Sequence, residues 1–314
     1  MDVGERVLGW LVSRRAGIVS DGDWDGILAS ALIVRELARR GYRPGVEFPP
    51  PSRIPGMEIG GVLLVELSPT RGYRVVDDAL LVDHHGFVGV KLLRPGGEEV
   101  WAEMGEADSV AELVARLLGL RLEGDWGRLL HAVNLIDTGR SGEDRLALTL
   151  HRAYLYNVSS PEMRRMLLEL LVEGRLGEVF KWAEEEAGKY EKALGLVDVI
   201  TGRARVLGGC AVAEYVLGGD EEKVYREAMF RLEERHGCCV MLAVRDGRVE
   251  KMHIGSFRED VDASRIAARI VEALKAVGVE ARGGGRRQAA GVQLLSPMEA
   301  TEAVEVLARV LGGR

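Results

Sequence analysis

Apolar and polar positions alternate along the first part of the chain in a way that predicts short strands followed by helices. Runs of four to eight apolar residues are typical of strands buried in a parallel sheet. The strand-like runs are 16–20, 60–67 and 79–85. Apolar residues at helical spacing occur at 26–41, around 107–120, at 125–139 and from about 160 to 195. Strands that alternate with helices predict an α/β fold with a doubly wound, mostly parallel sheet.

The second part of the chain has a different pattern of apolar and polar residues, which predicts a smaller α/β domain. Segment 203–216 has the pattern of a strand, and 238–257 that of a hairpin around Asp246-Gly247. The predicted helices are 221–237, a helix capped by Asp262 that runs to about 277, and 296–313, opened by Ser296 and Pro297. We place the boundary near 190–200, which gives domains 1–190 and 200–314 with a cleft between them.

Composition agrees with a folded, two-domain protein. The chain has 314 residues, 47% hydrophobic and 29% charged. Its net charge of −7 means that any nucleic-acid partner needs a local basic groove. No apolar run approaches the roughly 18 residues of a membrane span, and the first residues do not form a signal peptide. The three cysteines match neither a disulfide framework nor a zinc site. We therefore expect a soluble, cytoplasmic protein, and the scarcity of Asn and Gln favours a hot, archaeal source.

Carboxylates follow each predicted strand of the first domain. Functional groups in open α/β sheets gather at the carboxyl ends of strands. The acidic positions and their histidine neighbours are Asp21, Asp23, Asp25, Glu66, Asp83, His84, His85 and Asp137. Taken singly, each has an ordinary explanation, such as a solvated turn for 21–26, a structural role for His84 or a capping role for Glu66. Taken together, they predict a site for two cations, because burying so many acids without cations is costly.

The donor set favours particular metals and a particular chemistry. Carboxylates with a minority of imidazole suit Mn²⁺ or Mg²⁺ better than zinc. Two such ions about 3.5–4 Å apart stabilise both the attacking and the leaving oxygen of a phosphoryl transfer.

The motifs DGDWDG (21–26), VDHHG (82–86) and NLIDTG (134–139) resemble the successive motifs of the DHH phosphoesterase superfamily, which includes RecJ-type exonucleases and nano-RNases. The resemblance implies two Mn²⁺ ions, with Mg²⁺ as the alternative. It implies that Asp83, His84 and His85 are catalytic, with His85 a neighbouring ligand or a phosphate contact. The implied metal ligands are Asp21, Asp23, Asp25, Glu66, Asp83, His84 and Asp137, where Glu66 replaces the family's usual Asp.

The second domain carries a further resemblance. ARGGGRRQAAG (281–291) is similar to the glycine-rich loop of the DHH-associated domain, whose backbone N–H groups approach a phosphate. The implied substrate-binding residues are Gly283, Gly284, Gly285, Arg286 and Arg287. Two departures from the family are Arg286, in place of a His, and Gly255, in place of an Arg. An arginine binds phosphate bidentately but does not serve as a proton donor. A solvated, charged loop is the alternative interpretation of this segment.

The leading interpretation is a Mn²⁺-dependent exonuclease that hydrolyses single-stranded DNA or RNA, or short oligonucleotides, to mononucleotides. One alternative is a weakly active or inactive RecJ-like component of the replication complex that binds GINS and the MCM helicase. Another is a small-molecule phosphatase of the pyrophosphatase type, although the glycine-rich segment 281–291 argues against it.

Overall fold

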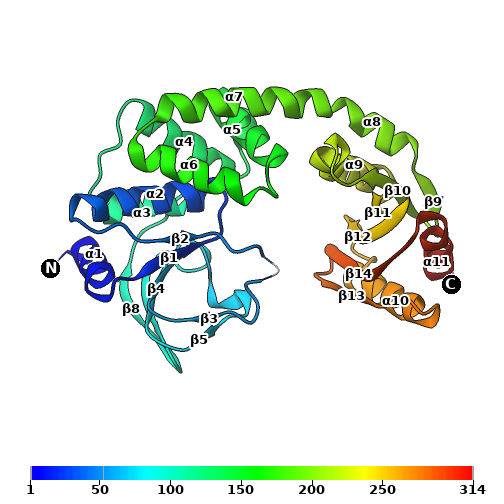
Figure 1. Ribbon diagram of the computed structural model, residues 1–314, viewed down its shortest axis with the longest axis horizontal. Coiled ribbons are helices and arrows are strands. Elements are labelled where there is room, and N and C mark those ends of the chain that lie inside the picture. The colour runs from blue at the N-terminus through cyan, green and yellow to red at the C-terminus, as the bar shows by residue number, and fades with distance from the viewer. Residues whose placement is uncertain (1, 52, 313–314) are drawn as a thin grey trace. The chain divides into compact units, whose positions relative to one another are not determined.

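The computed structural model describes residues 2–51 and 53–312 and divides into two compact units, residues 1–187 and 188–314. Helix α7 (Leu176–Ala193) runs across this division (Figure 1). Each unit contains a six-stranded sheet with its own hydrophobic core.

The sheet of the first unit has the strand order β2-β1-β4-β6-β7-β8. Its first four strands run parallel, and the hairpin β7–β8 adds two antiparallel strands at one edge. The mixed α/β class and the mostly parallel sheet are thereby confirmed. The strands are β1 (Gly17–Ser20), β2 (Val46–Glu47), β4 (Val62–Val65), β6 (Ala79–Asp83), β7 (Gly89–Arg94) and β8 (Gly97–Glu103).

The two faces of this sheet are covered differently. The α-helices pack over one face, where the core includes Ile18, Leu63 and Val82 (Figure 1). The other face buries Val19 and Leu64 beneath the small parallel pair β3 (Glu58–Ile59) and β5 (Arg74–Val75). In the described part of the chain no α-helical residue belongs to this second cluster. The helices are α1 (Val3–Arg14), α2 (Trp24–Arg39), α3 (Val110–Leu117), α4 (Asp125–Asp137), α5 (Arg145–Tyr156) and α6 (Pro161–Glu173), with 3₁₀ turns at Pro69–Arg71 and Ser141–Glu143.

The predicted long helix at 160–195 is two helices. Helix α6 ends at Glu173, and Gly174 follows with a φ of 77°. This left-handed conformation favours glycine and terminates a helix, because the backbone turns away from the helix axis. Helix α7 then begins at Leu176.

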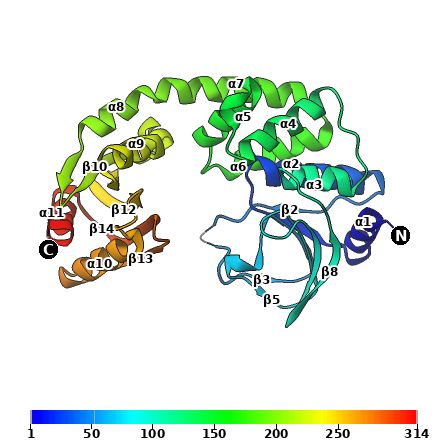
Figure 2. The same cartoon turned by 180° about the vertical axis from the view of Figure 1, so that it is seen from behind.

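The sheet of the second unit has the order β13-β14-β12-β11-β10-β9, in which only β10 and β11 are parallel. Helices α10 and α11 pack on one face of it, and α9 packs on the other, over β10 and β11 (Figure 2). The elements are α8 (Gly195–Gly202), β9 (Arg205–Leu207), β10 (Cys210–Val216), α9 (Asp220–His236), β11 (Cys238–Arg245), β12 (Arg248–Ser256), α10 (Ala263–Ala276), β13 (Ala281–Gly285), β14 (Ala289–Glu299) and α11 (Ala300–Gly312).

Three sequence predictions in this unit were wrong in detail. Segment 281–291 is an antiparallel hairpin, β13–β14, rather than a loop. The final helix begins at Ala300, because Ser296 and Pro297 belong to β14. The segment 203–216 is divided by a turn at Gly208-Gly209 into β9 and β10. In each case hydrogen bonding to a neighbouring strand outweighs the local preference for a loop, a helix start or a single strand.

A disulfide joins Cys210 to Cys238, contrary to the expectation that the cysteines stay unpaired. The two residues begin the adjacent strands β10 and β11, and their Cα atoms are 4.6 Å apart. Cys239 is buried and free. Closing a loop of 28 residues restricts the unfolded chain and stabilises the fold by about 3–4 kcal/mol. Sequence spacing missed the pair because α9 separates the two cysteines along the chain.

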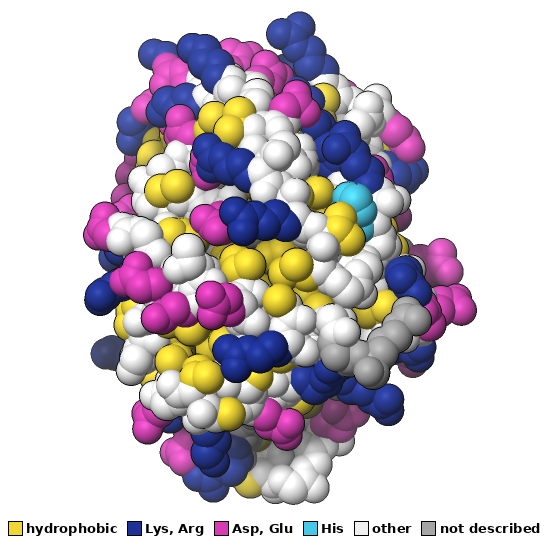
Figure 3. Space-filling model, turned by 90° about the vertical axis from the view of Figure 1, so that its right-hand side faces the viewer, with side chains coloured by type: hydrophobic (Ala, Val, Ile, Leu, Met, Phe, Trp, Pro, Cys, Tyr) yellow, Lys and Arg dark blue, Asp and Glu magenta, His cyan; other side chains and the backbone are white. Residues whose placement is uncertain are grey.

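No helix in the described residues is long and apolar enough to cross a membrane. The surface carries charges of both signs, and on the face drawn in Figure 3 hydrophobic side chains gather near the middle, between charged ones.

Candidate metal centre

The predicted acidic residues meet at one edge of the first sheet. Strands β1, β4 and β6 are neighbours and run parallel, so their carboxyl ends lie side by side. Asp21 follows β1, Glu66 follows β4, and Asp83 is the last residue of β6. Asp137 reaches the same edge as the last residue of α4.

Four of these residues form what we call the four-ligand group: Asp25, Glu66, His84 and Asp137. Each offers one ligand atom, and these atoms lie within 4.8 Å of one another. The Nε2 atom of His84 is 3.2 Å from Asp137 Oδ2, 3.8 Å from Asp25 Oδ2 and 3.9 Å from Glu66 Oε1. Three carboxylates around one imidazole nitrogen form a donor set for a divalent cation.

Backbone amides hold Asp25 in place. Its two carboxylate oxygens accept hydrogen bonds of 2.6 Å from the N–H groups of Val110 and Ala111. These N–H groups open helix α3, where the first amides of a helix have no partner within the helix and the helix dipole favours an anion. Asp25 is thus fixed by an element that begins 85 residues further along the chain.

The ring of His84 is oriented by a backbone carbonyl. Its Nδ1 lies 3.3 Å from the carbonyl oxygen of Ala107. In the neutral imidazole, a proton on Nδ1 that is donated to this carbonyl leaves the lone pair on Nε2, which faces the carboxylates. The ring is therefore held in the tautomer that a metal ligand requires.

The four-ligand group is electrostatically unfavourable without a cation. Burial, followed by the charge of Asp23, raises the pKa of Asp25 to about 7. Burial and then the charge of Asp25 raise the pKa of Glu66 well above its usual range. Burial lowers the pKa of His84, but the Asp137 carboxylate beside Nε2 and the charge of Asp25 outweigh burial and raise this pKa to about 9. Protons thus take the place of a missing positive charge.

Two buried atoms in the group also lack hydrogen-bond partners, Glu66 Oε2 and His84 Nε2. An unpartnered buried polar atom costs free energy unless a ligand or ion satisfies it. Together with the carboxylate-rich donor set, these atoms fit Mn²⁺ or Mg²⁺.

Glu66 joins the group despite its extra methylene relative to Asp. Its φ is 60°, a left-handed conformation that is uncommon outside glycine. Its carboxylate lies against α2, because a Cβ built on Gly26 would fall 3.0 Å from Glu66 Oε2 and 2.4 Å from Ser20 Oγ. The absence of a side chain at Gly26 therefore leaves room for the longer Glu66.

The other predicted ligands lie outside the four-ligand group. Asp21 pairs with Arg71 at 2.9 Å, and Asp23 caps α2 by accepting the Gly26 N–H. Asp83 Oδ1 accepts the N–H of His85 and lies 3.1 Å from its Nδ1. His85 is exposed and belongs, with Glu66 and His84, to a second set of metal-compatible ligand atoms.

Some residues that hold the segments around the metal centre in place could not be recognised from the sequence. Ser109 caps α3 and donates to Asn134 Oδ1 at 2.6 Å, which ties α3 to α4. Arg164 donates from Nε to the Gly22 carbonyl at 2.7 Å and so braces the segment that carries Asp21 and Asp23. Their partners are 25 and 142 residues away in the chain, and only the tertiary structure shows them.

In the second unit, Gly283–Gly285 lie in the edge strand β13, and Arg286 and Arg287 are in the turn to β14. Arg286 is exposed, and its backbone N–H donates to the Ala289 carbonyl. The side chain of Arg287 donates to the backbone carbonyl of Glu259. The arginine side chains therefore emerge at the tip of a hairpin.

Side chains from a neighbouring helix explain why position 255 is a glycine rather than the family's arginine. A Cβ built there would fall 1.7 Å from Glu233 Oε1 and 2.4 Å from Met229 Cε, so side chains of α9 fill the space. Glu233 is buried, its Oε1 has no hydrogen-bond partner, and burial raises its pKa to about 7.

We expect Glu233→Gln to stabilise the protein at pH 8 by about 2–3 kcal/mol and to have little effect at pH 4. A carboxyl whose folded pKa is raised costs nothing below its unfolded pKa of 4.5, and the cost develops as pH rises through about 7. Chemical unfolding at the two pH values measures this difference. Glu234→Gln, at the exposed neighbouring position, is the control and should show no such pH dependence. Equal effects of the two variants would contradict the prediction.

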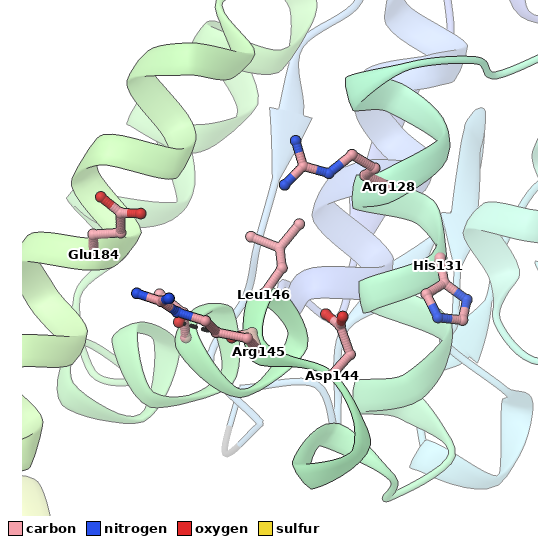
Figure 4. Close-up of a pocket in the computed structure, with 7 residues that line it drawn as sticks. Arg128, His131, Asp144, Arg145, Leu146 and Glu184 are labelled. Carbon is pink, nitrogen blue, oxygen red and sulfur yellow. Dashed lines mark hydrogen bonds between the residues drawn. The ribbon is translucent and has the colours of Figure 1, made fainter.

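A separate pocket of about 390 Å³ lies among α4, α5 and α7 (Figure 4). Its lining carries charges of both signs and includes no member of the four-ligand group. The lining residues are Arg128, His131, Asp144, Arg145, Leu146, Thr149 and Glu184.

No protein-family model matches the sequence, and no curated protein matches it. Solved structures do match. A pGpG-specific phosphodiesterase, PggH from Vibrio cholerae, is 16% identical with a TM-score of 0.52, covering 94% of this chain and 97% of that one. An exonuclease RecJ bound to manganese is 17% identical with a TM-score of 0.58, covering 98% and 93%. RecJ from Thermus thermophilus in complex with Mn²⁺ is 17% identical with a TM-score of 0.53, covering 98% and 53%. At these identities the likeness concerns the fold: over nearly its whole length the chain has a fold similar to those of RecJ and of the pGpG-specific phosphodiesterase.

Proposed function

We propose that this protein is a Mn²⁺- or Mg²⁺-dependent phosphodiesterase that hydrolyses single-stranded nucleic acid or short oligonucleotides, releasing mononucleotides from a chain end. The observation on which this proposal rests is the four-ligand group at the carboxyl ends of the first sheet's parallel strands. Two of its ligand atoms have no hydrogen-bond partner. The manganese-bound RecJ and the pGpG-specific phosphodiesterase, which share its fold, support the assignment.

The residues have distinct roles in this proposal. Asp25, Glu66, His84 and Asp137 hold one cation, and a second is held on the side of Asp21, Asp23 and Asp83. When bound, such ions activate water and neutralise charge on the phosphoryl oxygens. Asp83 orients the exposed imidazole of His85, whose Nε2 then contacts a phosphate oxygen.

The second unit supplies contacts to the substrate beyond the scissile bond. Of the three glycines Gly283–Gly285, Gly284 lets a nucleotide approach the backbone of β13, because a Cβ built there would meet nothing within 4 Å. The exposed Arg286 binds a phosphate bidentately. Arg287, held by the Glu259 carbonyl, adds positive charge beside it.

The test is hydrolysis of 5′-labelled single-stranded DNA, RNA and di- to pentanucleotides with Mn²⁺, Mg²⁺ or EDTA. We expect mononucleotide release that needs a divalent cation and is lost in Asp83→Asn. Asp78→Asn, at a half-buried position just before β6 where Asp78 pairs with Arg14 at 3.3 Å, should retain activity. Absence of hydrolysis with every substrate and cation would contradict the proposal. Capture of GINS by such an inactive protein would favour the replication-complex alternative.

A further inference from the structure

The sheet of the second unit has one face that is covered only in part. On β14, Val292 and Leu294 are buried in the core with α10 and α11, so Ala289, Gly291 and Gln293 point to the opposite face. On β13, a Cβ on Gly283 would meet Val271 of α10, so Arg282 and Gly284 belong to that opposite face as well. We call this exposed part of the sheet the glycine face.

Cations lie across the glycine face in register. Lys251 of β12 pairs with Gln293 of β14, and Gln293 pairs with Arg282 of β13, so the three form one row across the strands. Lys251 and Arg282 have no carboxylate partner among the described residues. The nearest acids on β12 and β14, Glu250 and Glu299, are paired with Arg245 and Arg248. Burial, followed by the charge of Arg226, lowers the pKa of Lys251, as expected of a cation without an anionic neighbour.

Two glycines occupy the next row of paired strand positions on the glycine face. The adjacent register row contains His253, Gly291 and Gly284. A Cβ built on Gly284 would meet nothing within 4 Å, so the surface above it is open. Along β13, Arg282 lies two residues before this glycine, on the same face of the strand. A phosphate can therefore approach the backbone beside Arg282.

An exposed aromatic pair lies at the other end of β12. Phe257 is 58% exposed and Phe230, on α9, is 49% exposed. Their rings are nearly parallel, with centroids 6.3 Å apart. Phe257 follows Ser256, whose N–H donates to the Gln288 carbonyl, so the pair lies beside the tip of the β13–β14 hairpin. Exposed aromatic rings next to cations are the usual components of a single-strand binding surface, because rings stack on bases and cations contact phosphates.

We propose that the glycine face binds an oligonucleotide several nucleotides long, with Lys251 and Arg282 contacting backbone phosphates and Phe257 stacking on a base. The inference rests on the proposed function and specifies its substrate class: a single strand longer than a dinucleotide. None of these three residues belongs to the glycine-rich segment's own GGGRR motif.

Binding measured without catalysis tests the proposal. Fluorescence anisotropy in EDTA gives the Kd of labelled single-stranded dT₁₀ for the full chain, and competition with unlabelled pdTdT gives the Kd of the dinucleotide. Lys251→Glu/Arg282→Glu should weaken dT₁₀ binding at least tenfold and reduce the slope of log K against log salt by about 1.4, because two phosphate contacts are lost. Phe257→Ala should weaken it by about tenfold. Neither variant should change pdTdT binding or its Mn²⁺-dependent hydrolysis more than twofold.

The matched control is Lys275→Glu/Arg309→Glu, which makes the same charge change on α10 and α11, across the sheet. Equal loss of dT₁₀ affinity in this control and in the glycine-face variant would overturn the proposal, as would equal effects on dT₁₀ and pdTdT. Arg282→Glu alone, at an exposed position, serves if the double variant unfolds. Length-dependent binding that survives in a protein without hydrolysis would support the glycine face while refuting the proposed function.

Discussion

Asp137→Asn is expected to lower Mn²⁺-dependent hydrolysis by about 10²–10⁴-fold while leaving the fold intact, which corresponds to losing several kcal/mol of transition-state stabilisation. Asp137 is the last residue of α4, and its Oδ2 lies 3.2 Å from His84 Nε2. Asn has the same shape but lacks the charge, so one anionic ligand is removed. The side chain of Asp137 is 17% exposed, which makes it the member of the four-ligand group whose change disturbs packing least.

Steady-state hydrolysis of a short labelled oligonucleotide at several Mn²⁺ concentrations measures this effect. A lost ligand should also raise the Mn²⁺ concentration needed for half-maximal rate. Asp125→Asn is the control, because Asp125 begins the same helix and pairs at the surface with Arg128 at 3.0 Å. Asp137→Asn with wild-type activity and wild-type Mn²⁺ dependence would show that the four-ligand group is not the catalytic metal site.

The second large effect is expected on thermal stability. Removing divalent cations should lower the Tm, and adding Mn²⁺ at about 100 times its Kd should stabilise the protein by about 2.7 kcal/mol. This corresponds to roughly 5–10 °C for a unit of this size. The stabilisation should be larger at pH 8 than at pH 5. Differential scanning calorimetry of the chelated and Mn²⁺-loaded protein measures both quantities.

The sign of the pH dependence follows from the pKa values of the ligands. The raised pKa of Asp25, about 7, means that its burial costs nothing below pH 3.8 and that the cost develops as pH rises through 7. His84, with its pKa raised to about 9, contributes stability that is complete below pH 6.5 and lost as pH rises through 9. The metal-free protein therefore weakens as pH rises, over the range in which the deprotonated ligands bind a cation more tightly.

Asp137→Asn provides the matched comparison for this experiment, and its Mn²⁺-induced change in Tm should be much smaller. A Tm increase that is the same in this variant, or that falls between pH 5 and pH 8, would contradict the assignment of the metal site. Such a result would not depend on whether any substrate is hydrolysed.

The sequence alone determined the α/β class and the mostly parallel sheet, because the periods of apolar residues are local properties that burial enforces. It also identified the acidic residues at strand ends, since parallel strands bring their carboxyl ends to one edge. The geometry at Glu66 could not be predicted in this way. Its φ of 60° and the room that Gly26 leaves for its carboxylate depend on the packing of α2 against β4.

The remaining features depend on contacts between segments far apart in the chain, and only the tertiary structure decided them. The amides of Val110 and Ala111 fix Asp25, and α9 brings Glu233 beneath Gly255. Pairing with β12 and β13 makes β14 a strand through Pro297, and the neighbouring strands β10 and β11 bring Cys210 to Cys238. Local patterns determine which residues prefer a strand, a helix or a turn. Hydrogen bonding and burial between distant segments determine which atoms finally meet, and in this protein they bring three of the predicted acids together with His84.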